Sequence, residues 1–158
     1  MPVRFLRNAS ELADVSMESP LPVQVTNARP VPADTLLVAT TTVTADANRD
    51  LLGSTSTELP TLDGCMQYRK LVWFYFRASD AATTYRVLAR ATDHNGAPLG
   101  TGWEVVIPPT ALPGDANSWG RIEIPSAGDG YYDQYRIEVH HTESNNYTLT
   151  SKVIGVRG

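Results

Sequence analysis

The chain contains little that could form a cross-link or a metal site. Cys65 is the single cysteine among 158 residues, so an intrachain disulfide is impossible. The three histidines are His94, His140 and His141, and the last two are neighbours on a predicted strand, where successive side chains point to opposite faces. A structural zinc site needs several such ligands close together. We therefore expect no metal and no cofactor, and we interpret Cys65 as an ordinary semi-buried residue.

Long apolar runs and strong charge are also missing. No stretch approaches the ~20 apolar residues that a membrane-spanning helix needs, and the first 25 residues lack the apolar core of a signal peptide. The net charge is −4 and charged residues make up 19% of the chain, whereas a protein that coats nucleic acid shows a basic patch or stripe. We expect a protein made in the cytoplasm that binds neither membrane nor nucleic acid.

The familiar catalytic motifs are absent from the sequence. It contains no Gly-x-Ser-x-Gly elbow, Walker loop, dinucleotide fingerprint or His-Glu-x-x-His. A Ser-His-Asp triad assembled in space stays open, because sequence alone does not reveal it. Glu104, Glu123 and Glu138 could provide paired carboxylates for a glycosidase, but their outward positions favour a solvated sheet face. Residues 93–96 resemble the start of a calcium loop, yet they lack the later glutamate of an EF-hand and suit a turn. A non-enzymatic protein is expected.

Residues 1–34 are predicted to form an extended, proline-rich arm. Five of the eleven prolines fall there, and proline biases its neighbours toward extended backbone. The apolar residues of the arm follow no helical or strand period, and a free arm would expose them to water. The arm is therefore expected to pack either on its own domain as an edge strand or on a neighbouring subunit. Its candidate partner contacts are Phe5, Leu6, Leu21, Val23 and Val25.

Residues 35–158 alternate between strand-like runs and turn residues, with no convincing long helix. This pattern predicts an all-β domain, a β-sandwich of jelly-roll-like type with about seven or eight strands, and a closed barrel is the main alternative. The predicted strands cover residues 36–45, 69–77, 84–92, 103–107, 120–125, 132–141 and 147–156. The prolines at 108 and 109 are expected to end the fourth run.

The large aromatic side chains admit two interpretations. Residues 69–77 are apolar on both faces, which is typical of a central strand covered on both sides but also suits a subunit contact. Trp119, Tyr131 and Tyr132 lie beside glycine- and proline-rich segments, so they could form a platform for stacking sugars. The alternative places Trp73 and Trp103 in the core and the loop aromatics at a sheet edge or an interface.

Two stretches resemble structural proteins of tailed bacteriophages. The phrase Ser-Pro-Leu-Pro-Val-Gln-Val at residues 19–25 is similar to the end of a short N-terminal segment that precedes a β-sandwich in those proteins. Residues 131–156 look like the closing hairpin of such sandwiches. The resemblance leaves the middle of the chain unmatched and transfers no site residues. In that family such domains serve as capsid decoration proteins, head fibres and accessory tail or baseplate proteins.

Together these features predict a non-enzymatic virion protein. We expect a capsid decoration or cement protein that binds the major capsid protein or other virion subunits and forms a homo-oligomer, with a trimer favoured. Two alternatives stay open. One is a tail or baseplate accessory subunit, and the other is a carbohydrate-binding module that attaches the virion to its host.

Replacing Phe5 and Leu6 with aspartate tests the role of the arm. Charged side chains at these positions would be buried without partners in a subunit contact, so the variant is expected to fold normally and to fail to join particles. Quantifying the protein in purified particles measures this. Full decoration by the folded variant would contradict the arm hypothesis.

Overall fold

The computed structural model describes residues 33–45, 56–79, 81–125, 132–143 and 145–157. The predicted arm contacts and Tyr131 lie outside these residues. The strands are β2 (Ala33–Val43), β3 (Thr57–Glu58), β4 (Lys70–Arg77), β5 (Thr83–Arg90), β6 (Glu104–Ala111), β7 (Ser118–Pro125), β8 (Gln134–His141) and β9 (Tyr147–Val156), and a short 3-10 helix, η2, spans Cys65–Gln67. Within the described ranges there is no α-helix, and no helix is long and apolar enough to cross a membrane.

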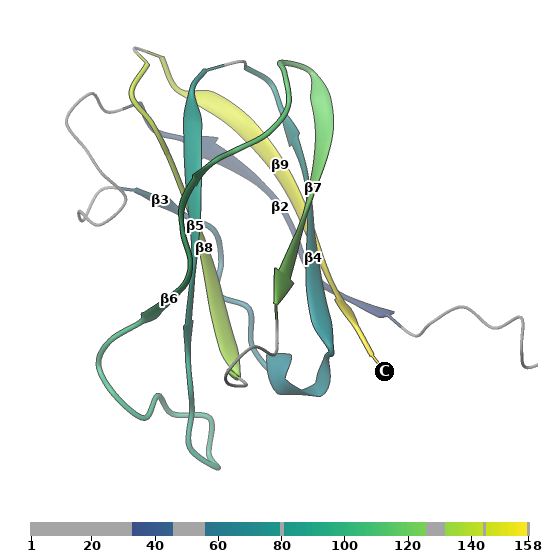
Figure 1. The fold of residues 1–158 in the computed structure, drawn as a ribbon, viewed down its shortest axis with the longest axis vertical. Coiled ribbons are helices and arrows are strands. Elements are labelled where there is room, and N and C mark those ends of the chain that lie inside the picture. Colours follow the sequence, from purple (N-terminus) through teal and green to yellow (C-terminus); the bar gives the residue numbers. More distant parts are fainter. Residues whose placement is uncertain (1–32, 46–55, 80, 126–131, 144, 158) are drawn as a thin grey trace, which may run out of the picture. The chain divides into compact units, whose positions relative to one another are not determined.

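The strands form two antiparallel four-stranded sheets that pack face to face (Figure 1). The first sheet, in the order β2-β9-β4-β7, is called here the front sheet, and the second, in the order β3-β8-β5-β6, the back sheet. The pairs β2–β9, β3–β8, β4–β7 and β5–β6 are nested in sequence. The chain is thus one long antiparallel hairpin folded across two layers, which is a jelly roll. The predicted β-sandwich is confirmed, and two separate sheets exclude the closed barrel for the described residues.

Side chains alternate between the core and the outer surfaces as a period of two requires. On β8, Tyr135, Ile137 and Val139 point inward and are at most 1% exposed. The inward residues of β7 are Ile122 and Ile124, as the sequence predicted. Apolar burial of this kind stabilises the fold by roughly 1.5–3 kcal/mol for each large side chain.

Strand β6 differs from the prediction because it continues through Pro108 and Pro109 to Ala111. It is paired with β5 and stands at the end of the described back sheet. Val87 pairs with Ile107 and Tyr85 pairs with Thr110, so the register shifts between these pairs. The two prolines therefore lie in an irregular part of the ladder. Edge strands and bulges are the places where a sheet tolerates proline, because the missing N–H need not join the ladder.

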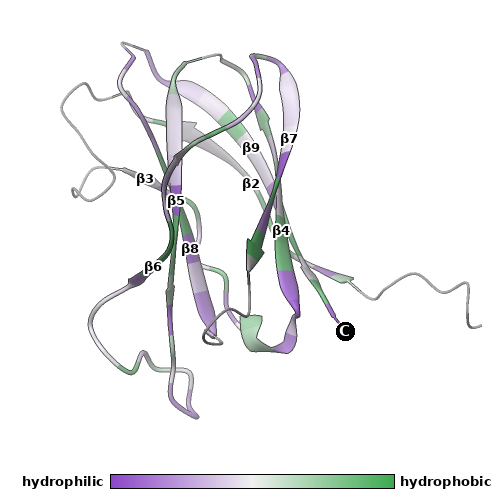
Figure 2. Cartoon of the chain, viewed as in Figure 1, coloured by the Kyte–Doolittle hydropathy of each residue, from purple (hydrophilic) through white to green (hydrophobic). Residues whose placement is uncertain are grey.

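Strand β4 occupies an inner position in the front sheet and is hydrogen-bonded to both β7 and β9. Every residue from Leu71 to Phe76 is aliphatic or aromatic, and Figure 2 shows green, hydrophobic segments along β4. Trp73 is fully buried, and its indole N–H donates to Ser151 Oγ over 3.0 Å. At the end of β4, the buried Arg77 guanidinium donates to the carbonyls of Leu112 and Gly114, each over 2.9 Å. This strand therefore links the core to the turn before β7.

Tyr75 and Gly120 face each other across β4 and β7. A Cβ atom at Gly120 would lie 2.2 Å from Tyr75 Cζ, so the tyrosine ring covers the glycine backbone. The tyrosine hydroxyl donates to the Pro113 carbonyl over 2.9 Å, which holds the ring in place. The glycine is therefore required by close approach of the ring.

Gly120→Ala is expected to lower the free energy of unfolding by about 1–3 kcal/mol, because the added methyl group forces the tethered Tyr75 ring to move. Urea denaturation followed by circular dichroism measures the change. Gly100→Ala is the matched control, since a Cβ there meets nothing within 4 Å, and its effect should stay within about 0.5 kcal/mol. Equal stability of the two variants would refute the packing of Tyr75 on Gly120.

Candidate functional site

The outer surface of the front sheet carries exposed aromatic and aliphatic side chains. Phe74 and Phe76 on β4 point away from the core and are half-buried. Trp119 on β7 pairs in register with Phe76, with ring centroids 5.2 Å apart, and is 67% exposed. We define the apolar sheet face by the outward residues Val38, Val72, Phe74, Phe76, Trp119 and Ile154. The sequence predicted that both faces of β4 are covered. The inner face is buried as predicted, whereas Phe74 and Phe76 on the outer face are partly exposed.

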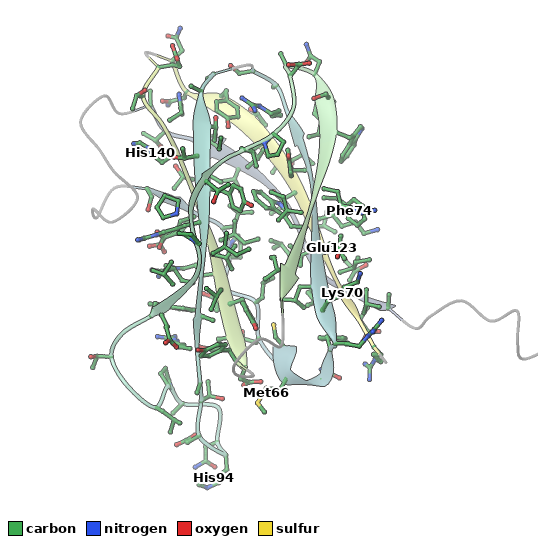
Figure 3. The ribbon with its side chains drawn as sticks, viewed as in Figure 1. Met66, Lys70, Phe74, His94, Glu123 and His140 are labelled. Carbon is green, nitrogen blue, oxygen red and sulfur yellow. The ribbon has the colours of Figure 1, made fainter. Side chains whose placement is uncertain are left out.

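Charged side chains lie among and beside the residues of the apolar sheet face. Lys70 Nζ lies 3.2 Å from Glu123 Oε2, and Arg121 lies 3.6 Å from the same oxygen. Lys152 pairs in register with Phe74. Figure 3 shows Phe74, Lys70 and Glu123 projecting from the side of the sandwich opposite His140. Because β9 lies between β2 and β4, Lys152 stands between Val38 and Phe74, and the surface combines apolar and charged groups.

A pocket of about 340 Å³ lies at the far end of β5, next to the start of β6. Trp103 is half-buried there, and its ring lies 4.2 Å from the Arg90 guanidinium and 4.6 Å from that of Arg136. The Tyr132 hydroxyl donates to Glu104 Oε1. The lining is Ala89, Arg90, Ala91, Leu99, Gly100, Gly102, Trp103, Glu104 and Tyr132. We call this the Trp103 pocket.

The predicted aromatic platform is not assembled as proposed. Trp119 belongs to the outer surface of the front sheet, while Tyr132 lines the Trp103 pocket beside the back sheet. Tyr131 lies outside the described residues. The alternative that placed Trp103 in the core is wrong. The chain enters β6 directly after this residue, at the end of the sheet, and the indole packs against the guanidinium groups of two arginines. Period-two alternation does not identify a residue just before a strand, and the only sequence signal that Trp103 lies outside the core was the pair of glycines before it, Gly100 and Gly102.

Glu138 differs from its predicted solvated position. It points outward from β8 but is 1% exposed, and Arg86 of β5 reaches it over 2.6 Å. Arg136 contacts its other oxygen over 2.7 Å, and Ser56 Oγ donates over 3.0 Å. A buried carboxylate held by two guanidinium groups and a hydroxyl serves as a structural ion pair. Glu104 and Glu123, the other two carboxylates, lie on different sheets.

The remaining candidate groups have structural partners. Cys65 is fully buried, and burial together with the carboxylates of Asp133 and Asp63 raises its thiol pKa to about 12, which disfavours the nucleophilic thiolate. Asp93 Oδ1 accepts the backbone N–H groups of Asn95 and Ala97 over 2.8 and 3.0 Å, so the calcium-like segment is a turn. Among the described residues no cluster of three or more Cys, His, Asp or Glu could hold a metal ion.

No protein-family model and no curated protein matches the chain. Among solved structures, one match is a chain from infectious bursal disease virus Gx strain, at 10% identity and TM-score 0.42, covering 81% of this chain and 32% of that one. The CBM22-1 xylan-binding domain of Paenibacillus barcinonensis Xyn10C matches at 13% identity and TM-score 0.38, covering 82% and 99%. The enzymatically active domain of bacteriophage CBA120 tailspike protein 4 matches at 16% identity and TM-score 0.38, and the match covers 80% of this chain and 19% of that one. With TM-scores below 0.5, these matches carry no inference about function.

Proposed function

We propose that this chain is a non-enzymatic structural protein of a phage virion, and that it binds neighbouring capsid subunits as a decoration or cement protein. The observation that carries the proposal is the apolar sheet face, with Trp119 67% exposed and Val38 69% exposed. Exposed aromatic and aliphatic side chains that share one face of a sheet mark candidate sites of protein association. The phage-like phrases at residues 19–25 and 131–156 support the choice of a virion as the setting.

The mechanism is interface burial. Covering Trp119, Phe74 and Phe76 with a partner surface would remove their remaining exposed area from water, and tryptophan is the residue most often dominant in such contacts. The charged residues around them, including Glu123 and Lys152, would set orientation more than affinity. Binding of this kind holds adjacent subunits together without any chemical step.

The arm would act on the same partner. Residues 1–32 join directly to β2, which belongs to the sheet that carries the apolar sheet face. If the arm contacts one subunit and the apolar sheet face another, the linkage of the two contacts raises the overall affinity above that of either alone. A tail or baseplate subunit would use the same surfaces. Whether purified capsids or purified tails carry the protein distinguishes the two locations.

Trp119→Ala is expected to reduce incorporation into particles strongly, because a dominant interface tryptophan contributes about 2 kcal/mol or more, roughly a 30-fold change in affinity. The fold should be retained, since the side chain is mostly exposed. Copies per purified particle, counted by quantitative mass spectrometry, provide the measurement.

Met66→Ala is the matched control for that experiment. Met66 is 58% exposed on η2, and Figure 3 places it at one end of the sandwich, away from Phe74. Its loss should leave incorporation unchanged. If the folded Trp119→Ala protein filled particles as the control does, the apolar sheet face would not be the docking surface.

A further inference from the structure

The Trp103 pocket is built on fixed backbone. Leu99 N–H donates to the Ala91 carbonyl over 3.0 Å, and Asp93 N–H donates to the Ala97 carbonyl over 2.7 Å, so the loop after β5 is a closed hairpin. Gly96 has φ +84°, the positive value that the predicted Asn-Gly turn supplies. Thr92 Oγ1 donates to Asp133 Oδ2 over 2.7 Å, which ties this hairpin to the residue after Tyr132. The wall that this hairpin forms is therefore held in place before any ligand arrives.

The groups that line the pocket combine an aromatic ring, small apolar residues and a few polar atoms. Ala91 and Leu99 provide apolar surface, and glycines 100 and 102 leave open space where side chains would stand. Glu104 Oε1 accepts the Tyr132 hydroxyl, and no described residue donates to its Oε2. Pockets of about 300–1,000 Å³ with a few convergent polar groups are typical small-molecule sites, and this one lies at the small end of that range.

The charges of the pocket select the chemical class of the ligand. The Arg90 guanidinium and the Glu104 carboxylate both line it, so their charges offset each other. A phosphate would meet Glu104 and a quaternary ammonium would meet Arg90, and each repulsion is unfavourable. A neutral ligand with several hydroxyl groups can donate to Glu104, accept from Arg90 and pack its C–H surface against the part of Trp103 that the Arg90 and Arg136 guanidinium groups leave uncovered. Arg90 Nε already donates to Gln134 Oε1 over 2.7 Å, which holds the guanidinium in position with its other N–H groups remaining.

From this geometry we infer that the Trp103 pocket binds a neutral saccharide of one or two rings. The site lies beside the back sheet, whereas the apolar sheet face lies on the front sheet. Saccharide binding thus goes beyond the proposed virion role and stands on different residues. It assigns Trp103, Glu104 and Tyr132 to recognition in place of Trp119.

Nitrogen-15 NMR of the full chain tests this inference through its three tryptophan indole signals, assigned with the Trp103→Phe and Trp119→Phe variants. Methyl glycosides of glucose, galactose, mannose and N-acetylglucosamine are titrated separately, with dissociation constants near 1 mM expected for so small a pocket. The Trp103 indole should shift saturably with at least one sugar. The indoles of Trp73 and Trp119 should stay in place.

Glu104→Gln is expected to raise that dissociation constant about tenfold, because it replaces a charged acceptor of the sugar hydroxyls by a weaker neutral one. Tyr132→Phe is expected to act in the same direction, because it removes the hydroxyl that holds the Glu104 carboxylate. Glu123→Gln, an exposed glutamate on the front sheet, is the matched control and should leave it unchanged. Absence of any Trp103 shift, a shift confined to Trp119, or binding insensitive to Glu104→Gln would overturn the inference. The inference would also be overturned if inorganic phosphate bound in the pocket and none of the sugars did. Incorporation into particles is measured independently, so either result leaves the proposed virion role to its own test.

Discussion

Successive side chains of β4 point to opposite faces, so one sheet-on-sheet contact cannot bury all of its large apolar residues. The inner set, Leu71, Trp73 and Tyr75, is at most 1% exposed and forms the centre of the core. Trp73 meets Tyr75 and Tyr85 at ring centroid distances of 4.9 and 5.7 Å, which joins the two sheets. Because β4 is hydrogen-bonded on both sides, its placement also sets the positions of β7 and β9.

Among the described residues, no second sheet packs on the outer set of β4. Phe74 and Phe76 keep part of their surface in solvent, and Trp119 on the neighbouring β7 extends the same apolar area. The back sheet is different, because its outward positions on β5 and β8 carry paired polar groups such as Arg86 with Glu138. The two outer surfaces of one sandwich thus differ in chemistry. Protein association on the front sheet and ligand recognition at the end of the back sheet are compatible roles within a single domain.

Period-two alternation made most strands predictable, and β8 is the clearest case because Tyr135, Ile137 and Val139 share the inner face. The nested strand order could not be derived, since it depends on contacts between residues far apart in sequence. The passage of β6 through Pro108 and Pro109 was missed because sequence does not say which strand ends a sheet.

The candidate sites were harder to predict than the fold. Alternation assigned Glu138 to an outer face but carried no information on what buries it there. Trp103 and Tyr132 meet in one pocket although they precede two different strands, β6 and β8, and their approach depends on the hairpin after β5. The most direct test of the docking surface is hydroxyl-radical footprinting of Trp119 in the free protein and in intact virions, with buried Trp73 as internal reference. We predict strong protection of Trp119 in virions, and equal oxidation in both states would contradict the account.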